Sequence, residues 1–155
     1  MMHRAKDHKG ASFLEIFQNC IVYNDDVLSD FTDKSVAADM QLLLEHGKPM
    51  LYGKEKNKGI RLNSEKLKLE AVTLGKNGVT EADILIHDET NRTLAGMLAR
   101  LNPPTMPIAL GVLYCDPGPN YVDSVVKQIE EAKAAKPNAD LNSVLRGGYT
   151  WTVAD

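Results

Sequence analysis

The sequence is poor in cysteine and in long apolar runs, and each shortage excludes a class of protein. Two cysteines, Cys20 and Cys115, in 155 residues cannot form the disulfide framework of a secreted domain. The longest apolar run, 108–114, is far shorter than the ~20 residues of a membrane-spanning helix, and no apolar stretch follows the polar start. We therefore expect a cytoplasmic protein without membrane contact, whose cysteines are free thiols or metal ligands.

The sequence also lacks the short motifs that mark complete active sites. It has no G-x-S-x-G nucleophile elbow, no H-E-x-x-H zinc motif, no G-x-G-x-x-G dinucleotide loop and no C-x-x-C pair. The chain therefore carries no self-contained active site of a known pattern. We assign no catalytic residue and no cofactor-binding residue to it.

What is present is the composition of an ordinary globular protein. Hydrophobic residues make up 43%, charged residues make up 25%, and the net charge is -3. This length and composition predict one soluble domain over residues 1–155, which ends in an irregular tail over 140–155. We expect Trp151 to anchor this tail to a surface groove. The slightly acidic balance gives no reason to expect a nucleic-acid partner.

The order of apolar segments predicts an α/β fold. Four apolar residues at helical spacing precede a proline pair: Leu94, Met97, Leu98 and Leu101. A continuous apolar strand at 108–114 follows them, and a strand expected at 84–87 precedes them. This order is typical of a right-handed βαβ unit in a mostly parallel sheet with flanking helices. Further strands are expected at 12–17 and 69–74, and the region 41–62 predicts a β-hairpin ribbon followed by a third extended piece.

Two more helices are expected outside this unit. The charged start of the chain is typical of a helix end that stops at Gly10. Asn120 can cap a second amphipathic helix, which Pro137 prevents from continuing. We expect its apolar stripe to be buried: Val122, Val125, Val126 and Ile129.

Cys20 is the candidate metal ligand of the chain. The apolar segment 12–17 is expected to be a buried strand that delivers Cys20 to a polar loop with Asn19, Tyr23 and Asn24. Backbone and amide donors near a thiolate suit a ligand of an iron–sulfur centre. A cubane cluster needs four thiolates, so this chain supplies one ligand or at most two. A buried structural thiol remains the alternative, and Cys115, at another strand end, has the same two interpretations.

Other polar residues have weaker claims to function. Asp88 and Glu89 follow a strand end, where open α/β sheets place their sites, but they also suit a helix cap and first turn. His46 is interpreted as a turn residue, since the sequence fixes no carboxylate or nucleophile beside it. His3 and His8 stand five apart, so they do not share a helix face as a zinc pair four apart would.

A local excess of basic residues contrasts with the acidic chain. We call these residues the basic ribbon: Lys54, Lys56, Lys58, Arg61, Lys66 and Lys68. They are either a solvated loop or a contact for a phosphate-bearing ligand or an acidic protein. Nucleic acid is disfavoured, because no aromatic residues are interleaved for base stacking.

Four ordered stretches of the sequence resemble a known family. They are HKGASFLEIFQNC, TDKSVAADMQLLLEHGKPMLYGKEKNKGIRLN, VTLGKNGVTEADILIHDE and GYTWTV. Together they resemble the C-terminal part of the β subunit of 2-oxoacid:ferredoxin oxidoreductases, and within that group the 2-oxoglutarate-type branch. The resemblance extends from residue 8 to residue 153, nearly the whole chain.

The resemblance implies the C-terminal portion of a thiamine diphosphate-binding fold and a part in an oxidoreductase. Such an enzyme decarboxylates a 2-oxo acid, forms an acyl-CoA and passes electrons through a [4Fe-4S] cluster to ferredoxin. It uses thiamine diphosphate with Mg2+ and contains an α subunit. Cys20, in QNC, aligns with one of the four cluster cysteines, whereas Cys115 matches no ligand of the family.

The sequence also departs from the family. It lacks the GDG motif that binds magnesium and the diphosphate, and it lacks the other cluster cysteines. We therefore expect a truncated or split β subunit that is inactive without a missing N-terminal half. The alternatives are a non-enzymatic remnant or interaction domain that docks on the parent complex, and a subunit of a pyruvate-type oxidoreductase.

Overall fold

The chain forms two compact units. The structure is a computed structural model that describes all residues except 139, 148, 149, 152 and 155. Unit 1 comprises Met1–His8 and Ser12–Asp116, and unit 2 comprises Lys9–Ala11 and Pro117–Asp155. The expectation of a single domain over residues 1–155 stays a prediction.

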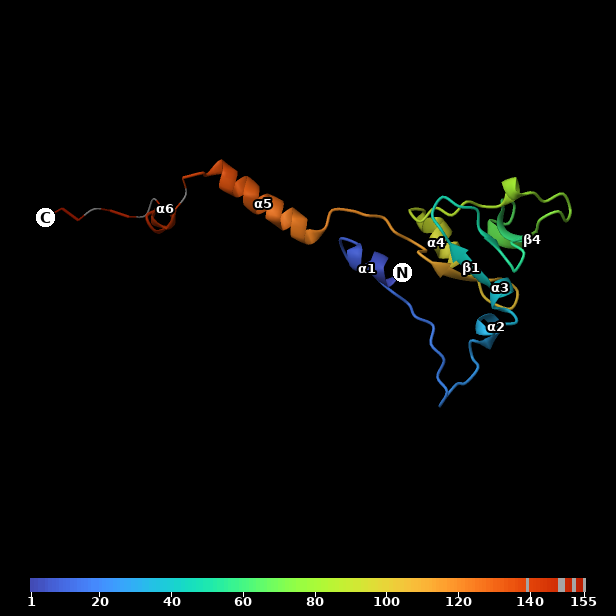
Figure 1. Cartoon of the computed structure of the whole chain (residues 1–155). Coiled ribbons are helices and arrows are strands. Elements are labelled where there is room, and N and C mark those ends of the chain that lie inside the picture. Colours follow the sequence, from blue (N-terminus) through green and yellow to red (C-terminus); the bar gives the residue numbers. More distant parts are fainter. Residues whose placement is uncertain (139, 148–149, 152, 155) are drawn as a thin grey trace. The chain divides into compact units, whose positions relative to one another are not determined.

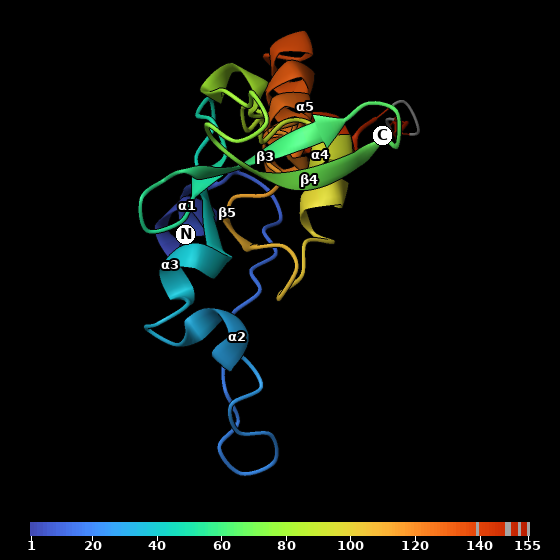
Figure 2. The same ribbon diagram turned by 90° about the vertical axis from the view of Figure 1, so that its right-hand side faces the viewer.

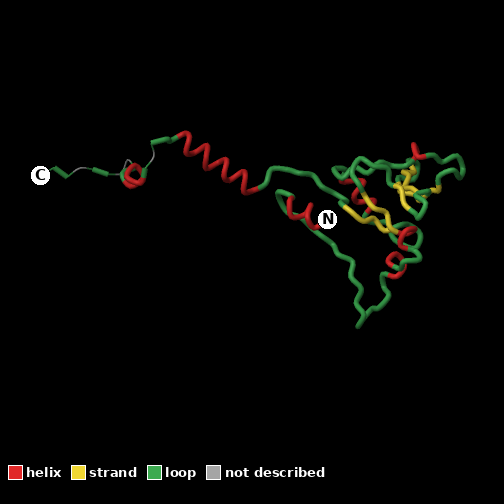
Figure 3. The backbone as a smooth tube through the Cα atoms, viewed as in Figure 1, coloured by secondary structure: helices red, strands yellow, loops and turns green. Residues whose placement is uncertain are grey.

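Most of the regular structure lies in unit 1 (Figures 1 and 3). Its helices are α1 (Met2–Asp7), α2 (Ser29–Thr32), α3 (Ala37–Met40) and α4 (Arg92–Leu98), with the 3-10 turn η1 (Glu81–Asp83). Its strands are β1 (Gln41–Leu44), β2 (Leu51–Tyr52), β3 (Lys58–Asn63), β4 (Lys68–Thr73) and β5 (Ile108–Gly111). Unit 2 contains α5 (Tyr121–Ala135) and α6 (Leu141–Leu145). In the described part of the chain, no helix has the length and apolar character needed to cross a membrane.

A two-stranded parallel sheet joins distant parts of unit 1. β1 pairs with β5, with Gln41 opposite Ile108 and Leu44 opposite Gly111. The predicted α/β class is confirmed, but the expectation of a mostly parallel sheet was wrong, because β2, β3 and β4 are antiparallel. The expected partner strand at 84–87 was also wrong. That segment forms an isolated bridge instead. Periodicity along the chain identifies apolar strands, whereas the choice between them depends on contacts that are distant in sequence. Assignment to a thiamine diphosphate-binding fold stays a prediction.

A three-stranded antiparallel sheet follows in the order β2-β3-β4. Figure 2 shows β3 and β4 side by side, paired over their full length. The hairpin expected within 41–62 was wrong in its pairing, because β2 pairs with β3 while β1 joins the other sheet. A Cβ atom at Gly59 would lie 2.5 Å from Cδ1 of Ile84. The glycine therefore lets the Ile84 side chain pack directly on β3.

The hydrophobic core of unit 1 lies between the two sheets and α4. Leu42 on β1 and Ile60 on β3 are both 0% exposed, and Leu94 and Leu98 of α4 join the same cluster. Burial of side chains of this size contributes about 1.5–3 kcal/mol each. The predicted helix face is thereby confirmed, with Met97 partly buried at its margin.

The segment 12–17 is not the buried strand that the sequence predicts. Figure 3 draws the chain between α1 and α2 as loop, and Phe13 is 92% exposed. Among the described residues, no strand pairs with this segment, so its backbone lacks the partner that a strand requires. Phe17 makes an edge contact with Phe31 at 5.5 Å between ring centroids. The segment is apolar in sequence, but unit 1 does not bury its side chains.

Unit 2 confirms the predicted helix and its cap. The side chain of Asn120 accepts a hydrogen bond from the backbone N–H of Asp123 at 2.8 Å, at the start of α5. The expected burial of its stripe was wrong, because no residue of α5 is buried. An amphipathic stripe is buried only where another apolar surface packs on it. Trp151 is 83% exposed, so its expected anchoring was also wrong, and α6 gives the predicted tail a short helix.

Candidate functional site

Cys20 lies in a tight turn rather than at a strand end. The backbone N–H of Asn24 donates to the carbonyl oxygen of Cys20 at 2.9 Å and closes the turn as an isolated bridge. Nδ2 of Asn19 donates to Oδ1 of Asp25 at 2.7 Å and ties the two flanks together. The predicted polar loop is therefore observed, while delivery by a buried strand was wrong. Cys20 is exposed, so it is not a buried structural thiol.

The turn surrounds the Cys20 thiol with backbone donors. Hydrogen bonding from the backbone of Tyr23, and then of Val22, lowers the pKa of this thiol below its ordinary value. Such bonds stabilise the thiolate relative to the thiol, and the thiolate is the form that binds iron. The donor set at Cys20 thus fits one thiolate ligand of an iron–sulfur cluster. Neither at Cys20 nor at any other place in the described residues do three His, Cys, Asp or Glu side chains converge on a possible metal position.

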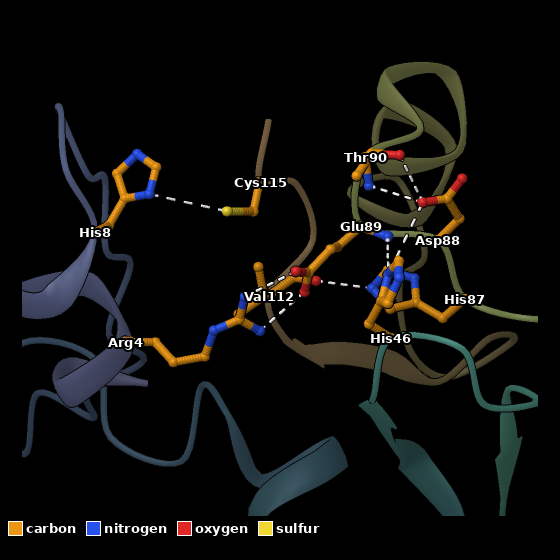
Figure 4. Close-up of polar contacts among 9 residues, drawn as sticks. All are labelled: Arg4, His8, His46, His87, Asp88, Glu89, Thr90, Val112 and Cys115. Atoms are coloured by element: carbon orange, nitrogen blue, oxygen red, sulfur yellow. Dashed lines mark hydrogen bonds and ion pairs between the residues drawn. The ribbon is translucent and has the colours of Figure 1, made fainter. Parts of the chain in front are cut away.

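A second group of polar residues gathers where β1 and β5 end. The strands are parallel, so their carboxyl ends meet at one edge of the sheet, the usual position of sites in open α/β sheets. His46 follows β1, Cys115 follows β5, and Asp88 and Glu89 lie in the loop before α4. We call His46, Asp88, Glu89 and Cys115 the carboxyl edge. Figure 4 shows how their side chains lie.

Glu89 is the most strongly bonded residue of the carboxyl edge. Arg4 donates from Nη1 to Oε2 at 2.9 Å and from Nη2 to Oε1 at 2.8 Å, a bidentate ion pair (Figure 4). The backbone N–H of Cys115 donates to the carbonyl oxygen of Glu89 at 2.7 Å. Nδ1 of His8 lies 3.9 Å from Sγ of Cys115. The guanidinium of Arg4 holds the pKa of Glu89 below its ordinary range.

Asp88 and His46 organise the loop backbone. Oδ1 of Asp88 accepts from the N–H of Thr90 at 2.9 Å and from its hydroxyl at 2.8 Å, which lowers the pKa of Asp88. Nδ1 of His46 accepts from the backbone N–H of Glu89 at 3.2 Å and lies 3.9 Å from Oδ1 of Asp88. These contacts support the turn role for His46. The interpretation of Asp88 and Glu89 as a helix cap and first turn was wrong, because Asn91 caps α4 and its first turn holds no acidic residue.

His87 is a residue that the sequence analysis did not single out. It is 1% exposed, and its Nε2 lies 2.8 Å from the carbonyl oxygen of Val112, so Nε2 carries the proton and donates. Its Nδ1 is buried and has no hydrogen-bond partner. The hydrogen bond from His87 to Val112 joins the segment 84–87 to the residue that follows β5. Its place in an apolar run, ILIH, was the one sequence signal of burial.

Half of the basic ribbon is engaged in ion pairs. Lys58 pairs with Asp39 at 2.8 Å, and Glu70 pairs with Arg61 at 3.5 Å and with Lys68 at 3.7 Å. The other three ribbon residues make no ion pair within the described part of the chain: Lys54, Lys56 and Lys66. The solvated-loop interpretation was wrong for the paired half, because these residues lie on β3 and β4. A ligand or partner role for the basic ribbon stays a prediction.

Comparison with known proteins gives one relative. The chain is 29% identical over 158 aligned residues to the 2-oxoglutarate oxidoreductase subunit KorB of Mycobacterium tuberculosis (strain ATCC 25618 / H37Rv). The match covers 99% of this chain, which spans 41% of the length of KorB. No protein-family model and no solved structure matches the chain. The similarity to KorB confirms the resemblance to the C-terminal part of a β subunit of a 2-oxoacid oxidoreductase, of the 2-oxoglutarate type.

Proposed function

We propose that this chain forms part of the β subunit of a 2-oxoacid:ferredoxin oxidoreductase, with 2-oxoglutarate as the substrate. The observation that carries this proposal is the similarity to KorB over 99% of the chain. The complete enzyme converts the 2-oxo acid and CoA to an acyl-CoA and passes electrons to ferredoxin. Thiamine diphosphate with Mg2+ supplies the carbanion that activates the 2-oxo carbonyl, and we assign no residue of this chain to it.

Within this assembly, Cys20 is one ligand of a [4Fe-4S] cluster. A cluster held in part by Cys20 would supply an electron relay whose potential depends on hydrogen bonds to the sulfur atoms. The exposed turn presents the thiol outward, and the backbone donors of Val22 and Tyr23 stabilise its anionic form. We propose that the other three thiolates come from other protein of the assembly. Cys115 is not a ligand in this proposal.

The apolar surface beside Cys20 supports an assembly with further protein. The segment from Phe13 to Tyr23 exposes several large apolar side chains. Their exposed fractions are 92% for Phe13, 63% for Ile16, 79% for Ile21, 75% for Val22 and 91% for Tyr23. A concentration of exposed large apolar side chains in one segment is typical of a protein interface. We propose that the rest of the β subunit covers it, and that this contact brings the remaining cluster ligands to Cys20.

Reconstitution of the cluster tests the proposal. The full chain is co-expressed with an α subunit and with a polypeptide that carries the other three cysteines and the GDG motif. The complex is purified without oxygen, and its iron content and its absorbance near ~400 nm are measured, where thiolate-bound clusters absorb. We expect Cys20→Ser to lose most of both signals while the complex still assembles. Cys115→Ser is the matched control, and its complex should bind as much iron–sulfur cluster as the wild-type complex does.

Two outcomes would argue against the proposed role. Equal cluster loading of wild type and Cys20→Ser would show that Cys20 is not a ligand. Stable binding of the chain to the complex, without any effect on cluster content or turnover, would favour an interaction domain that docks through the basic ribbon. The turnover rates of the complex with 2-oxoglutarate and with pyruvate are then compared to decide which 2-oxo acid is its substrate.

A further inference from the structure

Helix α1 lies on the carboxyl edge without being buried there. It has six residues, none of which is buried, and its Met2 side chain is exposed. An isolated helix of this length is marginal in water, because nucleation is costly and few hydrogen bonds follow it. Its conformation and its position therefore depend on contacts with the rest of unit 1.

Those contacts are polar: two side chains of α1 and its cap reach the edge of the sheet, and Oγ of Ser12 donates to the carbonyl oxygen of Ala5 at 3.1 Å. Arg4 forms the bidentate ion pair with Glu89, and His8, the C-cap residue of α1, lies 3.9 Å from Sγ of Cys115 (Figure 4). Glu89 and Cys115 are themselves joined by the backbone hydrogen bond of 2.7 Å. The Arg4 side chain is 54% exposed, whereas that of Glu89 is 14% exposed. The pair thus stands at the boundary between solvent and the edge of the sheet.

We propose that α1 is a detachable latch over the carboxyl edge, and that breaking the Arg4–Glu89 ion pair releases it and uncovers the Cys115 thiol. The closed state is held by one ion pair, one weak sulfur contact and the hydrogen bond from Ser12, and no residue of α1 is fully buried. Partly exposed pairs of this kind stabilise weakly, so the latch opens and closes readily. This inference concerns contacts within unit 1 and needs no cluster or partner subunit.

The substitution Glu89→Gln tests the latch most directly. It keeps the size of the side chain and leaves Arg4 in place, while it removes the charge that holds the guanidinium. We expect the open population to rise about fivefold, the change expected on losing a partly exposed ion pair. Two measurements on the full chain report it. Hydrogen exchange at the α1 amides should accelerate, and so should alkylation of Cys115 by N-ethylmaleimide, assigned by peptide mass spectrometry.

The chain offers matched controls for both measurements. Lys6→Ala removes a positive charge from the same helix, and Lys6 makes no ion pair among the described residues, so neither rate should change. Cys20 is an internal control in every alkylation reaction, because it is exposed and lies outside these contacts. The double variant Arg4→Glu with Glu89→Arg reverses the pair and should restore the wild-type rates.

Three results would overturn the proposal. Unprotected α1 amides in the wild type would show that the helix does not dock. Unchanged rates in Glu89→Gln would show that the ion pair does not hold it. Equal acceleration at Cys20 and Cys115 would indicate general loosening of the chain rather than release of a latch.

Discussion

The close approach of β5 to β1 leads to a sharp prediction for Gly111→Ala. Gly111 has φ +136°, and an added Cβ would lie 2.9 Å from the carbonyl oxygen of Leu44 and 3.0 Å from the Leu44 Cβ. A side chain at this φ is strained, which costs about 1–3 kcal/mol. The neighbouring atoms belong to the paired strand, so they can move apart only if the sheet moves, and overpacking of this kind costs a further ~1–3 kcal/mol.

These terms add to a destabilisation of about 4 kcal/mol, a large share of the roughly 5–15 kcal/mol by which a typical domain is stable. In a chain of this size, that loss lowers the melting temperature by about 8–16 °C. The assay is thermal unfolding followed by circular dichroism, with urea unfolding at 25 °C as a second measure.

Gly96→Ala is the matched control for this prediction. Gly96 lies in α4, and an added Cβ there meets no atom within 4 Å. The same substitution should therefore stabilise the protein, by about 0.5–1 kcal/mol, because alanine favours helix more than glycine does. A melting temperature for Gly111→Ala within about 2 °C of the wild type would refute the close pairing of β1 with β5.

Two further predictions concern packing and charge. Leu42→Ala should lower the free energy of unfolding in urea by about 2–5 kcal/mol, because Leu42 is fully buried. Its neighbour Leu43 is 62% exposed, so Leu43→Ala should change the free energy of unfolding by less than about 0.5 kcal/mol. Equal losses in the two variants would contradict the described core. The hydrogen bond from Asn63 lowers the pKa of Glu70 in the folded chain. Its stabilisation is therefore present above the unfolded value of about 4.3 and is lost as the pH falls through the lower folded value. Urea midpoints between pH 6 and 3 should fall less steeply in Glu70→Gln, and identical slopes would argue against this bond.

The proposed latch and the proposed cluster ligand were found from two different kinds of information. Cys20 was identified from the sequence, because its polar surroundings and the QNC string are local features. The Arg4–Glu89 pair joins residues 85 positions apart, and no spacing rule relates them. The buried His87 was missed for a related reason, since burial of one polar side chain depends on what packs around it.

The sequence by itself determined the α/β class, the helix at α4, the Asn120 cap of α5 and the resemblance to a 2-oxoacid oxidoreductase β subunit. Each of these rests on local periodicity, capping chemistry or ordered strings of residues. Tertiary structure alone decided that β1 rather than 84–87 pairs with β5, that 12–17 is exposed, and that no residue of α5 is buried. The physical reason is that an apolar pattern records a tendency to be buried, whereas the surface that buries it is set by segments far away in the chain or by another molecule.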